Sequence, residues 1–104
     1  MLVLIVNHYV KPGPGMVESA IKRLDGNGDR MREMPGFAFR YRMVAKEDPL
    51  KLTTVTGWES EQAYEGWLTL RRSGDPGPVF AGESPYARTD TEMHLVERQV
   101  LPAT

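Results

Sequence analysis

Residues 58–67 read Trp58-Glu59-Ser60-Glu61-Gln62-Ala63-Tyr64-Glu65-Gly66-Trp67, which places two tryptophans nine positions apart. The first tryptophan ends a run rich in threonine and valine that begins at Lys51 and is typical of a strand. Ser60 is a favourable helix N-cap, and an acidic residue follows it at the positive helix start, so the second tryptophan falls two turns into a helix. We expect both rings to line the gap between helix and sheet, where a flat apolar ligand would fit.

Strands and helices alternate on both sides of this stretch. The first helix begins at Met16 and extends to about Glu33, and Gly26 and Gly28 predict a kink or break within it because each costs about 1 kcal/mol against alanine. The second helix ends near Arg72, and the glycine- and proline-rich residues 73–90 are predicted to be irregular. Alternation and β-branched runs predict three further strands: Leu2–Val10, Phe37–Val44 and Glu92–Val100.

The resulting order, β-α-β-β-α-β, predicts an α+β fold of the ferredoxin-like class, with an antiparallel sheet and two helices on one face. The first strand is apolar on both faces, with Val3 and Ile5 on one and Leu2, Leu4 and Val6 on the other. Two helices cover only one of these faces. We therefore expect a homodimer in which the sheets of two subunits pack together.

Length and composition limit the function classes. The chain has 104 residues, 40% of them apolar, and a net charge of -1, which predicts a single domain with a core from about residue 2 to residue 100. The balanced charge gives no indication of nucleic acid or an anionic membrane. The absence of cysteine excludes disulfides and thiolate chemistry. No apolar run is long enough to span a bilayer and no signal peptide pattern is present, so a cytoplasmic location is expected.

Three features together resemble the antibiotic biosynthesis monooxygenase superfamily. They are Asn7 late in the first strand, Pro35-Gly36-Phe37 at the start of the second, and the stretch from Trp58 to Tyr64 that leads to Trp67. The superfamily consists of dimeric ferredoxin-like α+β barrels. It includes cofactor-free oxygenases of aromatic polyketides, haem-degrading monooxygenases and quinol-type enzymes.

Asn7 and Trp67 match two positions that the haem-degrading branch uses. That branch also requires a histidine about ten residues after the tryptophan to ligate iron, and residues 73–78 contain none. The resemblance therefore implies an enzyme without a cofactor, with haem as the less favoured alternative.

The resemblance implies Asn7 and Trp67 as catalytic candidates. Alternation puts Asn7 on the same face as Val3 and Ile5; if that is the helix side, its amide points toward Trp67 and can stabilise an oxyanion. Tyr86 and Arg88, in the loop expected after the second helix, would lie over the pocket mouth. Five residues are candidates for substrate binding: Tyr9, Trp58, Tyr64, Tyr86 and Arg88.

His8 and His94 are the two histidines, and neither has a partner at metal-ligand spacing, so no metal site is predicted. In a strand, His8 faces away from Asn7, which predicts a position toward the dimer interface. His94, in the last strand, is the candidate general base because imidazole titrates near neutral pH.

Two charged segments have competing interpretations. Residues 25–29, Asp-Gly-Asn-Gly-Asp, imitate the start of a calcium loop, but Arg30 replaces the required glycine at its sixth position and Gly36 replaces the glutamate at its twelfth. Arg40 and Arg42 share a strand face, where they either clamp a carboxylate or phosphate or form an ordinary ion-paired surface.

Three functions are consistent with these features. The first is a cofactor-independent monooxygenase acting on a small aromatic or quinol-like substrate in a pocket between sheet and helices. The second is a haem-binding or haem-degrading enzyme. The third is a non-catalytic dimeric module that binds a small apolar ligand.

Overall fold

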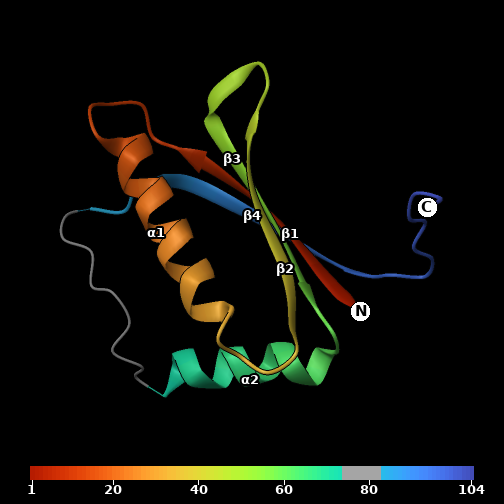
Figure 1. Cartoon of the computed structure of the whole chain (residues 1–104). Helices are drawn as coiled ribbons and strands as arrows, with labels where there is room; N and C mark the ends of the chain where they lie inside the picture. The colour runs from red at the N-terminus through yellow and green to blue at the C-terminus, as the bar shows by residue number, and fades with distance from the viewer. Residues whose placement is uncertain (74–82) are drawn as a thin grey trace.

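The computed structural model describes residues 1–73 and 83–104. A four-stranded antiparallel sheet has the order β2-β3-β1-β4, and the two helices follow β1 and β3 in the chain (Figure 1). The predicted ferredoxin-like order is confirmed. No helix in the described parts of the chain is both long and apolar enough to cross a membrane. The elements are β1 (Leu2–Val10), α1 (Met16–Met31), β2 (Phe37–Ala45), β3 (Asp48–Trp58), α2 (Glu61–Arg72) and β4 (Tyr86–Leu95).

Helix α1 is continuous through both of its glycines, so the predicted kink or break is wrong. A Cβ built on Gly28 would lie 3.1 Å from Cδ of Arg40 and 3.2 Å from its Nε. Glycine at this position lets the arginine side chain of β2 pass close to the helix. Gly28 therefore lowers the helix propensity of α1 but allows Arg40 to pack against the helix, and this contact is not visible in the local sequence pattern.

Helix α2 begins as predicted. The hydroxyl of Ser60 accepts a hydrogen bond of 3.1 Å from the backbone N–H of Ala63, with Glu61 in the first turn and two arginines in the last. This cap satisfies a backbone donor that the first helical turn otherwise leaves unpaired. It fixes the direction of the helix immediately after Trp58 and carries Trp67 over the sheet.

The pairing of β1 with β3 determines which side chains face the helices. Leu2 is opposite Trp58 and His8 is opposite Leu52, and these residues are buried on the helix side. Because successive residues alternate, Val3, Ile5, Asn7 and Tyr9 lie on the other side of the sheet. We call that side the open face.

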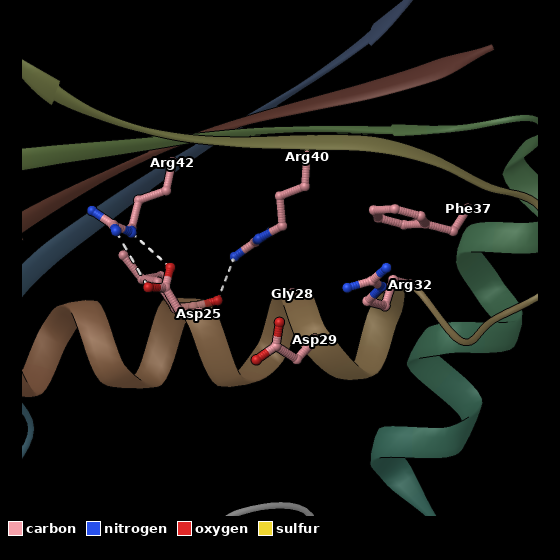
Figure 2. Close-up of a pocket in the computed structure, with 8 residues that line it drawn as sticks. Asp25, Gly28, Asp29, Arg32, Phe37, Arg40 and Arg42 are labelled. Atoms are coloured by element: carbon pink, nitrogen blue, oxygen red, sulfur yellow. Dashed lines mark hydrogen bonds and ion pairs between the residues drawn. The ribbon is translucent and has the colours of Figure 1, made fainter.

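Strand β2 departs from the predicted alternation. Its register with β3 shifts between Phe37 and Phe39, so Phe37 pairs with Trp58 and turns to the helix side while Phe39 lies over Gly57 on the open face. A β-bulge of this kind places two residues of one strand opposite one residue of its partner. As a result, Arg40 and Arg42 both point toward α1 (Figure 2).

Strand β4 begins at Tyr86 and ends at Leu95, so the prediction of a strand from Glu92 to Val100 is wrong at both ends. Except at Tyr86, the strand is exposed along its whole length because it forms an edge of the sheet. An exposed edge strand lacks the apolar alternation by which a strand is recognised in sequence. Residues 96–104 continue without regular structure and leave the body of the domain (Figure 1).

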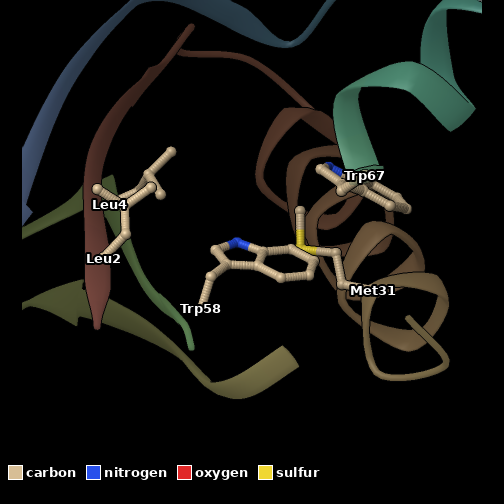
Figure 3. Close-up of a cluster of buried hydrophobic side chains, with 5 residues drawn as sticks. All are labelled: Leu2, Leu4, Met31, Trp58 and Trp67. Atoms are coloured by element: carbon tan, nitrogen blue, oxygen red, sulfur yellow. The ribbon is translucent and has the colours of Figure 1, made fainter. Parts of the chain in front are cut away.

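The core between sheet and helices has two clusters. The indole of Trp58 extends from the sheet toward Met31 of α1, with Trp67 of α2 on the far side (Figure 3). Both tryptophans are at most 1% exposed, as expected from the opening stretch. The second cluster joins Val10 and Leu52 of the sheet to Ala20 and Leu24 of α1.

The open face carries apolar side chains without a covering layer in this chain. Tyr41 is 62% exposed and Met43 is 43% exposed. Monomeric proteins rarely leave a continuous apolar sheet face in water, so this face is a candidate interface. The apolar side chains on it are Val3, Ile5, Phe39, Tyr41, Met43 and Val55.

Candidate active site

A cavity of about 240 Å³ lies between the sheet and both helices, and we call it the inner cavity. Every secondary-structure element contributes to its wall. Its polar lining comprises hydroxyl, amide, imidazole and guanidinium groups, and no carboxylate is among the lining residues. The lining residues are Leu4, Val6, His8, Leu24, Asn27, Met31, Arg40, Thr54, Thr56, Trp58, Tyr64, Trp67, Leu68, Arg71 and Thr91.

Aromatic rings form one end of the inner cavity. The ring centroids of Trp58 and Tyr64 are 6.2 Å apart, and Trp67 completes this wall from α2. The guanidinium carbons of Arg30 and Arg71 lie 5.5 and 5.8 Å from the centroid of the Trp67 ring, within cation–π range. These contacts hold the second indole in place at the apolar end of the cavity.

Arg40 brings a partly buried positive charge to the cavity. Its guanidinium donates to the Thr56 hydroxyl at 2.7 Å, to the Leu24 carbonyl at 3.4 Å and to the Met31 sulfur at 3.6 Å. All three acceptors are uncharged. Burial lowers the pKa of Arg40 from its usual value, and the nearby carboxylate of Asp25 partly offsets this. A desolvated cation bonded to neutral groups is electrostatically suited to an anionic ligand.

His8 lies on the helix side of β1 and is 8% exposed, so the prediction that it faces a dimer interface is wrong. Its Nε2 is 3.1 Å from the Thr54 hydroxyl, and its buried Nδ1 has no hydrogen-bond partner among the residues that the structure describes. Burial, together with the positive charge of Arg40, lowers the pKa of His8 from 6.5 to about 4. At neutral pH the imidazole is therefore uncharged and can accept a proton.

Asn7 does not point toward Trp67. The amide lies on the open face, where its Oδ1 accepts a hydrogen bond of 2.8 Å from the Thr53 hydroxyl. Both faces of β1 are apolar, so alternation alone could not decide which one the helices cover. The helix side is the face that holds Leu2 and His8, and the conditional placement of Asn7 in the pocket is wrong.

Three other candidates also lie away from the inner cavity. Tyr9 and Arg88 contact each other on the open face, with the guanidinium carbon 4.1 Å from the ring centroid. Arg88 belongs to β4 and not to a loop over the pocket mouth. His94, the candidate base, is in β4 opposite Val3 and pairs with Glu92 at 3.0 Å, so it too is on the open face.

The remaining candidates lie on the helix side. Trp58, Tyr64 and Trp67 line the inner cavity. Tyr86 is the first residue of β4, and its ring centroid is 5.3 Å from that of His8. Its hydroxyl donates to the Ala20 carbonyl at 3.3 Å, so it supports the imidazole from behind and does not cover the cavity.

A second hollow, of about 480 Å³, lies between α1 and β2, and we call it the outer cleft (Figure 2). Within it Arg42 forms a two-pronged ion pair with Asp25, at 2.6 and 3.2 Å. The segment that imitates a calcium loop is helical here, so its oxygens do not surround a common centre. The cleft is lined by Leu24, Asp25, Gly28, Asp29, Arg32, Phe37, Arg40 and Arg42.

Metal-ligand clusters are not found in the part of the chain that the structure describes: no three His, Asp or Glu side chains come together. The described groups of the inner cavity that can act on a ligand are His8, Arg40 and the aromatic wall. Sequence reasoning missed His8 as a cavity residue and left Arg40 undecided. The signal that was available is Thr54 and Thr56, which share a face with Trp58 and so mark the helix side of β3.

Comparison with known proteins agrees with this architecture. The sequence model of the antibiotic biosynthesis monooxygenase family matches residues 1–73. The chain belongs to the antibiotic biosynthesis monooxygenase family. No curated protein sequence matches it.

Solved structures share the fold over nearly the whole chain. A variant of MhuD with two manganese protoporphyrin IX bound per active site superposes with a TM-score of 0.77 at 20% identity, covering 98% of this chain and 100% of that one. A variant of SnoaB, a cofactor-independent oxygenase from Streptomyces nogalater, gives 0.68 at 13% identity, covering 98% and 97%. The ActVA-Orf6 monooxygenase of Streptomyces coelicolor, solved with nanaomycin D, gives 0.65 at 22% identity, covering 98% and 92%.

Proposed function

We propose that this family member is a cofactor-independent monooxygenase that oxidises a small acidic aromatic compound, such as a naphthol or quinol, with molecular oxygen. The observation that carries the proposal is the partly buried guanidinium of Arg40. It reaches the same cavity as a neutral His8, and its hydrogen-bond acceptors among the described residues are all uncharged. The family relationship supports oxygen chemistry, and the cavity supports the kind of substrate.

The size of the inner cavity favours a compact ligand. Its volume of about 240 Å³ is just below the range of about 300–1,000 Å³ that is usual for drug-sized ligands. One or two fused rings stack against Trp58 and Trp67, and the leucines and Met31 exclude water around them. A dry site strengthens every charge interaction made within it.

Arg40 and His8 have complementary roles in forming the substrate anion. His8 takes the phenolic proton, and the guanidinium of Arg40 stabilises the oxyanion left behind. Before substrate binds, burial and the positive charge of Arg40 keep the imidazole unprotonated. Once the phenolate has formed, its negative charge raises the pKa of the imidazole and stabilises the ion pair. Arg40 thus takes the oxyanion-binding role that sequence reasoning assigned to Asn7.

The substrate itself supplies the electrons that reduce oxygen. For 1-naphthol, the phenolate donates electron density through C4 to O2, and a C4–O bond forms to give a hydroperoxide after protonation by the imidazolium. Loss of the C4 proton and cleavage of the O–O bond then release water and leave 1,4-naphthoquinone. One naphthol and one O2 give one quinone and one water, so no external reductant is needed.

Oxygen uptake on a panel of 1-naphthol, anthrone and naphthohydroquinone tests the proposal. We expect enzyme-dependent uptake with at least one of them, and a loss of about 100-fold in kcat when Arg40→Gln removes the oxyanion partner. Arg72→Gln makes the same charge change on α2 outside both cavities and serves as the control. No uptake with any substrate that nevertheless binds would instead favour a passive binding module.

Haem is the alternative ligand, because the similar MhuD structure contains manganese protoporphyrin IX and His8 offers an unpartnered nitrogen. A porphyrin is at least drug-sized, and pockets for ligands of that size measure about 300–1,000 Å³. The inner cavity, at about 240 Å³, does not fit it as the side chains stand.

The open face supports a homodimer as the working unit. Ile5, Tyr41 and Met43 present apolar surface that a second copy of the sheet would cover. Sedimentation equilibrium at micromolar concentration is expected to give twice the chain mass, and Tyr41→Asp is expected to shift the equilibrium toward monomer. A monomeric mass for the unmodified protein would refute the dimer.

A further inference from the structure

Arg40 belongs to the walls of both hollows. Its guanidinium contacts Thr56 on the side of the inner cavity, and its stem passes Gly28 at the outer cleft. Leu24 is likewise shared between the two linings. The two hollows therefore adjoin at Arg40 and Leu24, so a ligand bound in the inner cavity lies next to the outer cleft.

We propose, building on the function proposed above, that the outer cleft binds a carboxylate substituent of the substrate through Arg32 and Arg40. The preferred substrate is then an aromatic acid, and 1-naphthol represents its phenolic ring without the acid group. Its ring occupies the inner cavity, and its acid group lies between the end of α1 and the start of β2.

The charges of the outer cleft favour an anion. Asp25 and Arg42 neutralise each other in their two-pronged contact. The guanidinium of Arg32 makes no hydrogen bond or ion pair with any residue that the structure describes, and among those residues Arg40 donates to uncharged acceptors. Two guanidinium groups thus remain against the single carboxylate of Asp29. The negative end of the α1 dipole also lies near Arg32, and the two full positive charges outweigh that partial charge.

The shape of the outer cleft favours a carboxylate attached to carbon. Figure 2 shows Arg32 and the ring of Phe37 at the same end of the cleft, with Arg40 pointing from its strand toward α1. A planar guanidinium donates two parallel hydrogen bonds to a carboxylate, which a point charge does not do. The ring of Phe37 provides an apolar surface for the adjoining carbon atoms.

Calorimetric titration with a matched pair of probes tests this inference. The probes are 1-hydroxy-2-naphthoate and its uncharged amide, 1-hydroxy-2-naphthamide, at pH 7 and low salt. We expect the acid to bind about tenfold more tightly, as one charge-assisted hydrogen-bonded contact implies. Arg32→Gln should remove most of this preference, Asp29→Asn should increase it, and Arg72→Gln should leave it unchanged. The two test residues of the cleft are on the surface, and melting temperatures confirm that each variant is folded.

Equal affinity for the acid and the amide would overturn the inference, as would a preference that survives Arg32→Gln. The outcome is separable from that of the proposed function. Oxygen uptake with 1-naphthol and no preference for the acid leaves the oxygenase and rejects the carboxylate site. A preference for the acid that depends on Arg32, without oxygen uptake on any probe, establishes the carboxylate site and rejects the oxygenase.

Discussion

The lowered pKa of His8 makes the stability of the domain depend on pH in a defined window. Burial and the charge of Arg40 keep the imidazole neutral in the folded state until the pH approaches about 4, whereas in the unfolded chain it takes up a proton near 6.5. Protons therefore bind preferentially to the unfolded state between these values. The contribution of His8 is complete above pH 6.5, is lost progressively as the pH falls toward 4, and changes no further below that.

The magnitude follows from the two pKa values of His8. Their separation corresponds to at most about 3 kcal/mol of unfolding free energy. The inner cavity admits water, which screens part of this interaction, so we expect about 2 kcal/mol. For a domain of this size that is a large fraction of the total stability.

Urea denaturation of the unmodified protein and of His8→Gln, from pH 7.5 down to pH 4, isolates this effect. Glutamine can still hydrogen-bond the Thr54 hydroxyl but does not titrate. The difference in unfolding free energy between the two proteins therefore cancels the contribution of the carboxylates, which both proteins share. We expect the unmodified protein to lose about 2 kcal/mol relative to the variant across the window. Parallel pH curves would refute the placement of a neutral, buried imidazole at this position.

Three further predictions concern the residues around the site. Gly28→Ala should change the unfolding free energy by less than about 1 kcal/mol, because better helix propensity offsets the crowding of Arg40, yet it should lower turnover in the oxygen assay by displacing the guanidinium. A full-rate variant would show that the position of Arg40 is unimportant. Asn7→Ala should keep its turnover and lose only about 1 kcal/mol in urea, since its amide bonds Thr53 on the open face; a collapse in kcat at unchanged dimer content would contradict this. Haemin titration should give no saturable shift of the haem absorbance band, and a band that saturates at one haem per chain and disappears in His8→Ala would restore the haem hypothesis.

The order of elements and the aromatic core could be predicted from the sequence because their signals are local. The Ser60 cap, the threonine- and valine-rich run before Trp58 and the helical spacing that leads to Trp67 act over a few residues each. Both indoles are buried as expected. Such agreement between local pattern and tertiary packing is usual for elements with a strong apolar periodicity.

The candidate site was less predictable because its geometry depends on long-range pairing. Asn7 and His8 are neighbours in β1, so their side chains point to opposite faces of the sheet. Because both faces of β1 are apolar, the sequence of β1 alone does not show which of the two faces the helices. The register with β3 decides that it is His8. Gly28 was predicted to break the helix because its low helix propensity is a local signal, whereas its close contact with the Arg40 side chain is a tertiary one. Strand β4 is polar and exposed, so its start at Tyr86 carries no apolar alternation. For this reason the sequence prediction placed Arg88 in a loop.

The most direct test of the central claim follows the oxygen atoms. The protein is incubated with 1-naphthol under 18O2, and the product is analysed by mass spectrometry beside a parallel reaction in labelled water. The proposed chemistry predicts 1,4-naphthoquinone with one 18O atom from O2, formed at a rate that Arg40→Gln sharply lowers and Arg72→Gln does not. Product labelled only from water, or hydrogen peroxide accumulating in place of labelled quinone, would contradict the assignment of the inner cavity as a monooxygenase site.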